Sequence, residues 1–379
     1  MSGINGHMRA PLLATAAATA PHPSLLAASF PTWSGALRHE VLRTLADFVR
    51  TRCVDDLSAA GVDVAADILE AFVAGGKCVR STYMYLGWRC GAVDDPGALR
   101  AAASFELLHA FALLQDDVMD GSTLRRGRPA AHVRFAQWHR ERALSGSPER
   151  FGEAAAVLLG DLCLVWAQQM MRESGVDDIA LARAWPRYDA MRTELAVGQF
   201  ADLVNDAAEF PEWERVLDVL RRKSGNYTVR RPLEIGAAMA GCEPSLLRLL
   251  GEYGEAVGEA FQLRDDVLGI FGSPDITGKP AGSDLFEHKA TSVVVAAYHL
   301  ADATLRRELT QLMSTSDLRD TDIRRWRKLI VATGAVEWIE QLIDSRLTRA
   351  LDVIDTRALD PVIRTALADM AAACTERAA

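Results

Sequence analysis

Three carboxylates stand at the end of one apolar run. The segment Glu106 to Asp120 reads ELLHAFALLQDDVMD, and a Gly-Ser pair breaks the helical pattern directly after it. Asp116 and Asp120 lie four residues apart, so a helix places them on one face, with Asp117 beside them. Carboxylates at a helix C-terminus oppose the macrodipole at a cost of about 0.3–1 kcal/mol each. No Lys or Arg three or four residues earlier offsets that cost.

A second apolar run ends in the same way. Ala260 to Gly272 reads AFQLRDDVLGIFG and carries Asp265 and Asp266. One acidic pair is typical of a solvated surface turn, but its recurrence on two apolar helices favours a ligand that removes the repulsion. Mg2+ usually binds through one or two carboxylates together with phosphate oxygens of a substrate. The two segments therefore predict metal-bridged binding of a diphosphate.

Basic residues gather in short segments, several of which contain glycine. A Gly-Gly pair lets the backbone approach a phosphate closely. Each segment alone is typical of a turn or a solvated surface, and a lone His on an apolar face is typical of a core. Together they supply more cationic groups than one diphosphate needs, so we expect a second phosphate-bearing substrate held by Lys, Arg and His directly. The candidate binding residues are Gly76, Lys77, Arg80, His109, Arg125, Arg126, Lys223, Ser224, Lys279 and Lys289.

Helical periodicity runs through nearly all of the chain from Trp33 onward. Apolar residues at spacings of three and four mark four long segments, namely His39 to Arg50, Leu99 to Gln115, Ala154 to Met171 and Val336 to Ile354. Alternating runs typical of strands are absent, so we predict an all-α fold with strands at most incidental. Residues 32–379 are expected to form one helical domain, and the Ala- and Pro-rich residues 1–31 a disordered leader.

The composition excludes several classes of protein. The 379 residues are 49% hydrophobic and 25% charged, as in soluble globular chains. A formal net charge of -9 argues against binding to nucleic acid. We expect no transmembrane segment, because the best apolar stretch, Val157 to Ala167, is short and interrupted by Asp161. The six cysteines form no CxxC pair, so we expect neither zinc nor disulfides, and a cytoplasmic location.

The motifs follow the order seen in one enzyme family. The segments GGKCVR, LLHAFALLQDDVMD, STLRRGRP, LLGD, GQFADL, KSGNYT and FQLRDDVLG, followed by TGKPAGSD, resemble the trans-isoprenyl diphosphate (polyprenyl) synthases between Gly75 and Thr291. DDVLGIFG with TGKPAGSD is similar to the actinobacterial short-chain group, which includes geranylgeranyl diphosphate synthases. The resemblance implies an all-α, single-domain bundle around a central cavity, and a homodimer. It also implies condensation of isopentenyl diphosphate with an allylic diphosphate (dimethylallyl, geranyl or farnesyl).

The resemblance also implies roles for individual residues. The metal ligands are Asp116, Asp117, Asp120, Asp265 and Asp266, which would hold a set of about three Mg2+ ions, with Mn2+ as an alternative. The allylic diphosphate contacts are Arg125, Lys223, Gln262 and Lys279. The isopentenyl diphosphate contacts are Lys77, Arg80, His109 and Arg126.

Four positions depart from the family pattern. Gly269 replaces the third aspartate of the second acidic motif and leaves that motif two aspartates. Cys78 replaces a frequent basic residue and Ser81 a usual proline, which we expect to weaken the affinity for isopentenyl diphosphate. His288 stands where glycine is common. None of these changes removes a residue that we regard as indispensable.

The product length is predicted from the helix before the first acidic motif. In this family the growing chain points down that helix, and Ala112 lies one turn before Asp116 on the same face. An aromatic side chain there would close the pocket early, whereas alanine leaves it open. Phe111 and the deeper Leu108 are expected to form a lower floor, although both also suit an ordinary core. We predict geranylgeranyl diphosphate, with farnesyl diphosphate as the alternative.

Two other classes share part of the pattern. A class I terpene cyclase pairs one aspartate-rich motif with an Asn/Ser/Glu motif, and Asn205-Asp206 lacks the serine and glutamate at the required spacing. A non-catalytic synthase subunit tends to lose acidic ligands, whereas this chain keeps two full pairs. Both are less favoured than a prenyltransferase.

Overall fold

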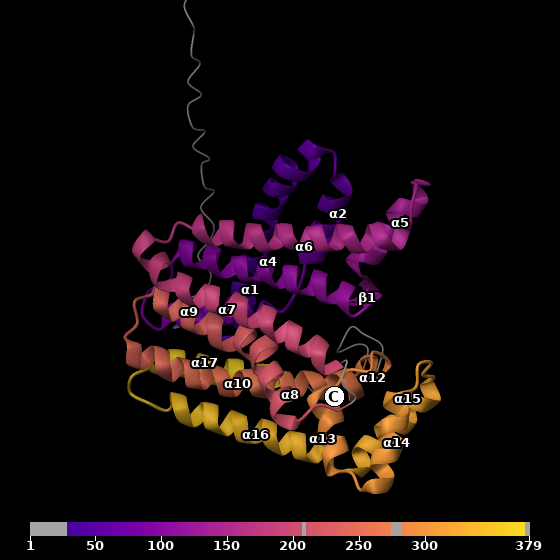
Figure 1. Ribbon diagram of the computed structural model, residues 1–379. Coiled ribbons are helices and arrows are strands. Elements are labelled where there is room, and N and C mark those ends of the chain that lie inside the picture. Colours follow the sequence, from indigo (N-terminus) through magenta and orange to yellow (C-terminus); the bar gives the residue numbers. More distant parts are fainter. Residues whose placement is uncertain (1–28, 207–209, 274–281, 376–379) are drawn as a thin grey trace, which may run out of the picture.

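Long helices lie side by side through most of the chain, as the computed structural model shows (Figure 1). It describes residues 29–206, 210–273 and 282–375. The prediction of an all-α fold is confirmed. The first helix begins at Phe30, two residues inside the segment assigned to the leader. Residues 1–28 of the predicted leader and Lys279 lie outside the described residues.

The α-helices are α1 (Phe30–Arg52), α2 (Asp63–Val73), α3 (Val79–Arg89), α4 (Pro96–Met119), α5 (Ala131–Glu141), α6 (Pro148–Arg172), α7 (Asp178–Asp206), α8 (Trp213–Val219), α9 (Arg231–Met239), α10 (Pro244–Phe271), α12 (Ser283–Phe286), α13 (Ser292–Leu300), α14 (Ala303–Met313), α15 (Asp320–Ala332), α16 (Ala335–Ile354) and α17 (Pro361–Thr375). Two π-helical segments, η1 (Cys53–Leu57) and η3 (Leu220–Arg230), and a 3-10 turn, η2 (Ser58–Ala60), continue or join them. The strands found in the described residues are β1 (Leu124–Arg125) and β2 (Arg128–Pro129), which pair as a short antiparallel hairpin.

Local sequence signals fix both ends of α4, the helix that carries the first acidic motif. The Asp95 side chain accepts a hydrogen bond from the backbone N–H of Ala98 at 2.8 Å, and Pro96 occupies the first turn. At the other end Gly121 adopts a φ of +62°, a conformation that suits glycine and stops the helix. The acids therefore lie in the last turn, as the sequence predicts.

The core forms around α4 and α10. Helix α4 packs against α6, α3 and α1, and α10 packs against α16 and η3 (Figure 1). The predicted apolar stripe of α1 is confirmed, because Val41, Leu45 and Val49 are buried in this core. Apolar burial on this scale is the main source of stability for such a bundle.

Two glycines let the backbones of α7 and α10 approach the backbone of η3 closely. A Cβ at Gly198 of α7 would lie 2.6 Å from the backbone N of Lys223, and one at Gly258 of α10 would lie 2.6 Å from the carbonyl oxygen of Gly225. Real Cβ atoms do not approach other atoms below 3.0 Å. Helices α7 and α10 therefore hold η3, and with it Lys223, in a fixed position between them.

Two of the described helices, α4 and α6, are long and apolar enough to cross a membrane by length and composition alone. Their most apolar windows are 67% and 44% buried inside the protein, respectively. A core helix meets the same criterion, so these two helices are weak evidence for a membrane span.

Candidate active site

Two lysines from distant parts of the chain lie on the carboxylates of the first acidic motif. The Lys289 Nζ lies 2.5 Å from Asp120 Oδ2, and the Lys223 Nζ lies 3.3 Å from Asp116 Oδ1. Lys223 also contacts Asp202 Oδ2 of α7 at 2.5 Å. The sequence around these acids contains no nearby Lys or Arg three or four residues earlier. Lys223 of η3 and Lys289, in the segment before α13, therefore supply the positive charge.

The two carboxylates titrate in opposite directions. Burial tends to raise the pKa of Asp116, but Lys223, Lys289 and Arg125 outweigh burial, so that pKa lies below its ordinary value. Burial and the neighbouring Asp116 raise the pKa of Asp120 despite Lys289. Asp116 is therefore held in its charged form by the neighbouring cations, whereas burial and Asp116 make ionisation of Asp120 less favourable.

The middle aspartate of the first motif serves the fold. Asp117 is buried, and the Nε of Arg125 donates to its Oδ1 at 2.8 Å. The β1–β2 hairpin presents Arg125, because Arg126 and Gly127 at its turn both adopt a positive φ. Arg125 also lies 3.5 Å from Asp116. This ion pair fixes the hairpin against the end of α4.

The middle aspartate of the second motif is also engaged. Asp266 accepts hydrogen bonds from the backbone N–H and the hydroxyl of Ser292 at 3.0 and 2.6 Å, and from Gln262 Nε2 at 2.8 Å. Burial raises its pKa to about 6. Asp265, one residue earlier, is partly exposed. Asp266 thus anchors the start of α13, and Asp265 is the less buried of the two aspartates.

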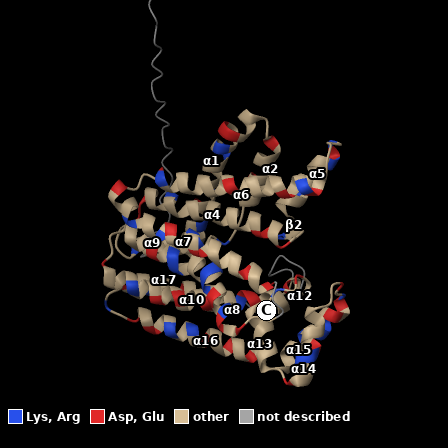
Figure 2. Cartoon of the chain, in the orientation of Figure 1, with Lys and Arg blue, Asp and Glu red and all other residues tan. Residues whose placement is uncertain are grey.

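The segment from Lys289 to Ser292 brings the two acidic motifs together. Its first residue contacts Asp120 of α4, and its last contacts Asp266 of α10. Between them, the backbone N–H of Ala290 donates to Asp206 Oδ1 at 3.2 Å. The predicted convergence of the two distant acidic stretches is therefore present, and the ends of α4, α7 and α10 meet at this segment. Figure 2 shows acidic and basic residues gathered around α8 and α12, at the same end of the bundle.

Among the residues that the structure describes, no three Asp, Glu, His or Cys side chains form a ready-made metal site. The lysines occupy the positions beside Asp116 and Asp120 where cations are stabilised. Mg2+ takes much of its octahedral shell from waters and phosphate oxygens. The residues present therefore fit a metal that binds together with a diphosphate.

The predicted Gly-Gly loop is held from two sides. Arg38 of α1 donates to the carbonyl of Gly76 at 2.6 Å, and Arg126 donates to that of Gly75 at 3.0 Å. Gly76 adopts a φ of +137°, a conformation that requires glycine. Lys77 follows the loop and is exposed. The loop and the hairpin residue Arg126 thus lie together, as the sequence predicts.

Several buried hydrogen-bonding atoms beside this loop have no partner among the described residues. Arg80 donates to the Thr228 hydroxyl at 2.8 Å and lies over the Tyr227 ring, but its Nε has no partner among the residues that the structure describes. In the same part of the chain, the Nδ1 of His109 and the Tyr227 hydroxyl also lack partners. Buried polar groups are normally hydrogen-bonded, so this cluster of unpaired polar atoms is unusual for the interior of a protein.

The pKa of His109 is lowered by its surroundings. Burial and then the neighbouring Arg80, Arg126 and Arg125 lower its pKa well below the ordinary value. The imidazole is therefore neutral at pH 7 and can act as a hydrogen-bonding group. A narrow pocket of about 10 Å³ lies beside it, lined in part by Gly75, Glu106 and Arg126.

Three of the departures from the family pattern have a structural counterpart. The Ser81 hydroxyl donates to the buried Glu106 carboxylate at 2.7 Å. His288 has a φ of +52°, which explains why glycine suits this position, and its Nε2 lies 2.8 Å from the carbonyl oxygen of Thr315. Cys78 also adopts a positive φ, of +52°.

The three residues assigned to product length lie on α4 as expected. Leu108 is fully buried, whereas Phe111 and Ala112 are partly buried and pack against the core. A Cβ at Gly160 of α6 would lie 3.1 Å from the Gln115 side chain and 3.6 Å from the Phe111 carbonyl oxygen. Helix α6 therefore forms a wall close to this face.

Several site residues were not predicted. Asp202, Asp206, Asp284 and Glu287 all lie around Lys223 and Lys289. Asp202 and Asp206 end α7 four residues apart, as Asp116 and Asp120 do on α4, so the same spacing rule could have found them. Ser224 lies in η3 as expected.

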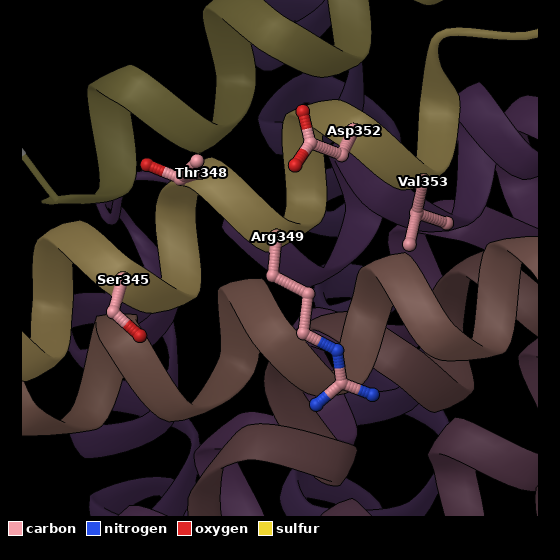
Figure 3. Close-up of a pocket in the computed structure, with 5 residues that line it drawn as sticks. All are labelled: Ser345, Thr348, Arg349, Asp352 and Val353. Atoms are coloured by element: carbon pink, nitrogen blue, oxygen red, sulfur yellow. The ribbon is translucent and has the colours of Figure 1, made fainter.

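An open pocket of about 580 Å³ lies elsewhere, along α16. It is lined by Ser345, Thr348, Arg349, Asp352 and Val353 (Figure 3). These residues belong to the part of α16 that leads to α17, away from α13 (Figure 1). The pocket is therefore separate from the acidic motifs.

Comparisons with known proteins agree with this geometry. The polyprenyl synthetase family profile matches residues 62–330. A geranylfarnesyl diphosphate synthase of Aeropyrum pernix is 31% identical over 76% of this chain and 85% of its own length. A geranylgeranyl diphosphate synthase of Mycobacterium tuberculosis is 30% identical over 78% of this chain and 79% of its own length.

A solved structure is also similar. The geranylgeranyl pyrophosphate synthase of Corynebacterium glutamicum, complexed with isoprenyl diphosphate and magnesium, superposes with a TM-score of 0.86. It is 34% identical, and the match covers 90% of this chain and 99% of that one.

Proposed function

This chain belongs to the polyprenyl synthetase family and is a trans-isoprenyl diphosphate synthase, a transferase, and from that premise we propose that its main product is geranylgeranyl diphosphate. The observation that carries the product length is Ala112, four residues or about 6 Å of helix below Asp116. Its methyl group leaves room for a growing chain beside α4. Leu108 and Phe111 supply the lower floor. Farnesyl diphosphate is the alternative product. It would be expected if the floor of the pocket lay closer to Asp116.

Each of the two substrates is assigned to its own group of residues, one at the ends of α4 and α10 and one beside the Gly-Gly loop. The ends of α4 and α10 hold the allylic diphosphate, with Asp116, Asp120 and Asp265 as ligands of about three magnesium ions, which manganese could replace. When bound, the metal withdraws charge from the diphosphate and helps its C–O bond to break. Lys223 and Lys289 are released from the carboxylates and donate to the phosphate oxygens. Burial tends to lower the pKa of both lysines, but the surrounding carboxylates raise it above the ordinary value, so both stay protonated.

The other diphosphate lies by the glycine loop. Lys77, Arg80 and Arg126 would hold the isopentenyl diphosphate, and the neutral His109 would donate or accept a hydrogen bond. Cleavage of the C–O bond releases pyrophosphate from the allylic substrate and leaves an allylic cation. The double bond of isopentenyl diphosphate then attacks C1 of this cation, and the released pyrophosphate accepts the proton that leaves the adjacent carbon. Apolar side chains of α4 and α6 exclude water from the cation.

The enzyme is proposed to act as a homodimer. Large apolar side chains are exposed on two long helices, with Leu158 and Val165 of α6 at 64% and 61%, and Phe200 and Val204 of α7 at 74% and 57%. Exposed apolar side chains at this density are typical of an interface. A second copy of the same chain is the occupant that the family relationship favours.

A single incubation tests the proposed reaction. The purified protein is given Mg2+, isopentenyl diphosphate and each of dimethylallyl, geranyl and farnesyl diphosphate, and the products are treated with phosphatase. The expected result is geranylgeraniol as the main alcohol. Farnesol as the end product would favour the alternative, hydrocarbons would indicate a cyclase, and no turnover a non-catalytic subunit.

A further inference from the structure

One arginine of α1 differs from the other arginines of that helix in its partner. Arg43, Arg50 and Arg52 form ion pairs with carboxylates three or four residues away. Arg38 forms no ion pair within the described part of the chain. Its Nε donates instead to the carbonyl oxygen of Gly76 at 2.6 Å, 38 residues along the sequence. Hydrogen bonds from a charged donor are stronger than neutral ones, so this contact ties the Gly-Gly loop to α1.

The carbonyl that Arg38 holds determines the direction of the next N–H group. The described residues contain no cis peptide bond, and in a trans peptide the C=O and N–H groups point in opposite directions. Arg38 therefore directs the backbone N–H of Lys77 away from itself. Since the φ of Gly76 is +137°, the loop reaches this arrangement through a conformation that requires glycine. The contact thus sets the orientation of the peptide from which the Lys77 side chain extends.

Arg38 also brings positive charge to a position that has lost it. Cys78 stands where a basic residue is frequent in the family, and its side chain is buried. Burial, and then Glu106, raise the pKa of the Cys78 thiol, so that the thiol is neutral at pH 7. Arg38 and Arg126 both act on this thiol in the opposite sense, which places both guanidinium groups near it.

Helix α1 also borders the region in which these groups lie. Leu45 follows Arg38 by two helical turns, on the same face. It lines the narrow pocket beside His109, together with Gly75 and Arg126. One side of the region assigned to isopentenyl diphosphate is therefore formed by α1, and Arg38 lies on that side, against the loop.

We propose that Arg38 is a positioning residue for isopentenyl diphosphate. It holds the Gly76 carbonyl so that the N–H and the side chain of Lys77 face the diphosphate, and it supplies from α1 the positive charge that Cys78 lacks. This inference rests on the proposed assignment of the loop to isopentenyl diphosphate. Binding of the allylic diphosphate, which is assigned to the ends of α4 and α10, should not depend on Arg38.

The test measures the Kd of isopentenyl diphosphate by isothermal titration calorimetry, in chelator and without an allylic substrate, so that the metal-dependent site does not contribute. Arg38→Gln removes the charge and should raise this Kd by about fivefold or more. Arg38→Lys keeps a charged donor and should stay within about threefold of the wild type. The matched control is Arg43→Gln on the same helix, which loses only ion pairs with Glu40 and Asp47 and should stay within about twofold.

Steady-state kinetics separate positioning from a general loss of structure. In Arg38→Gln the KM for isopentenyl diphosphate should rise by about fivefold or more, whereas kcat and the KM for the allylic diphosphate should stay within about twofold. Damage to the fold would change all three quantities. If Arg38→Gln binds isopentenyl diphosphate as tightly as the control, or if both KM values rise together, the inference is wrong.

The binding assay also keeps this inference distinct from the proposed function. A wild type that binds isopentenyl diphosphate but forms another product, or none, would contradict the proposed function, and the Kd values would still decide the role of Arg38. A wild type that does not bind isopentenyl diphosphate would overturn both.

Discussion

Replacing Asp206 by asparagine is expected to stabilise the metal-free protein in a pH-dependent way. Burial, and then the neighbouring Asp202, raise the pKa of Asp206 from 3.8 to about 6. A folded-state pKa above the unfolded one means that ionising the group disfavours the fold. The wild type therefore loses stability as pH rises from about 4 to about 6, and stays less stable above that range. The substituted amide could still accept the Ala290 N–H without carrying charge.

The size of the effect follows from the shift. About two pKa units correspond to roughly 3 kcal/mol at pH 7.5. Because Asp206 is partly exposed, solvent screening reduces this to about 1–2 kcal/mol. For a chain of this length, that difference raises the melting temperature by about 1–3 °C. At pH 4.5 the advantage should fall to about a third, since part of the unfolded chain is then protonated as well.

The assay is thermal unfolding of wild type and Asp206→Asn in chelator at pH 4.5 and 7.5. Asp317→Asn, an exposed carboxylate, serves as the control and should shift neither curve in a pH-dependent way. A variant that is less stable than the wild type at pH 7.5 would refute the reasoning. An equal gain at both pH values would do so as well, because the titration of Asp206 would then not be its cause.

Further predictions concern the pocket, the core, the metal and the dimer. Ala112→Phe should shorten the main product by at least one prenyl unit in chromatography of the alcohols, and an unchanged spectrum would contradict the floor assignment. Glu259→Gln should lower the free energy of unfolding by about 2–4 kcal/mol in urea titrations, because this buried carboxylate lies 2.5–2.6 Å from two arginines; a loss below about 0.5 kcal/mol would show that the network contributes little. Chelation of Mg2+ should abolish turnover, and its readdition should restore it; turnover that persists in chelator would exclude metal assistance. Leu158→Glu with Val165→Glu should give a monomer in light scattering, and an unchanged mass would place the interface elsewhere.

The helices and the acidic motifs could be predicted because their signals are local. Apolar spacing marks α1, α4, α6 and α16, and the Gly-Ser pair after Asp120 marks the end of α4. The Gly-Gly loop and Arg126, which the sequence analysis assigned to one substrate, lie together in the structure. In each case the residues that matter are close in sequence, or their types are rare enough to stand out.

The partners of the acidic residues could not be predicted in the same way. Lys289 reaches Asp120 from 169 residues away, and Lys223 reaches Asp116 from 107. Such pairs depend on how the helices pack, which spacing along the chain does not encode. The same holds for Asp284, since only the packed structure shows that its carboxylate occupies the space beside Gly269.

The protonation of His109 could not be predicted for a related reason. Burial together with Arg80, Arg126 and Arg125 lowers its pKa, because a charged imidazole would be both desolvated and repelled. This effect follows from the packed surroundings, which the sequence does not show.

The most direct test of the central claim is a crystal structure of this protein with Mg2+ and inorganic pyrophosphate. The account predicts ions that bind Asp116 and Asp120 on one side of the pyrophosphate and Asp265 on the other, with Lys223 and Lys289 moved from the carboxylates to the phosphate oxygens. A pyrophosphate bound without metal contact to both α4 and α10 would contradict it.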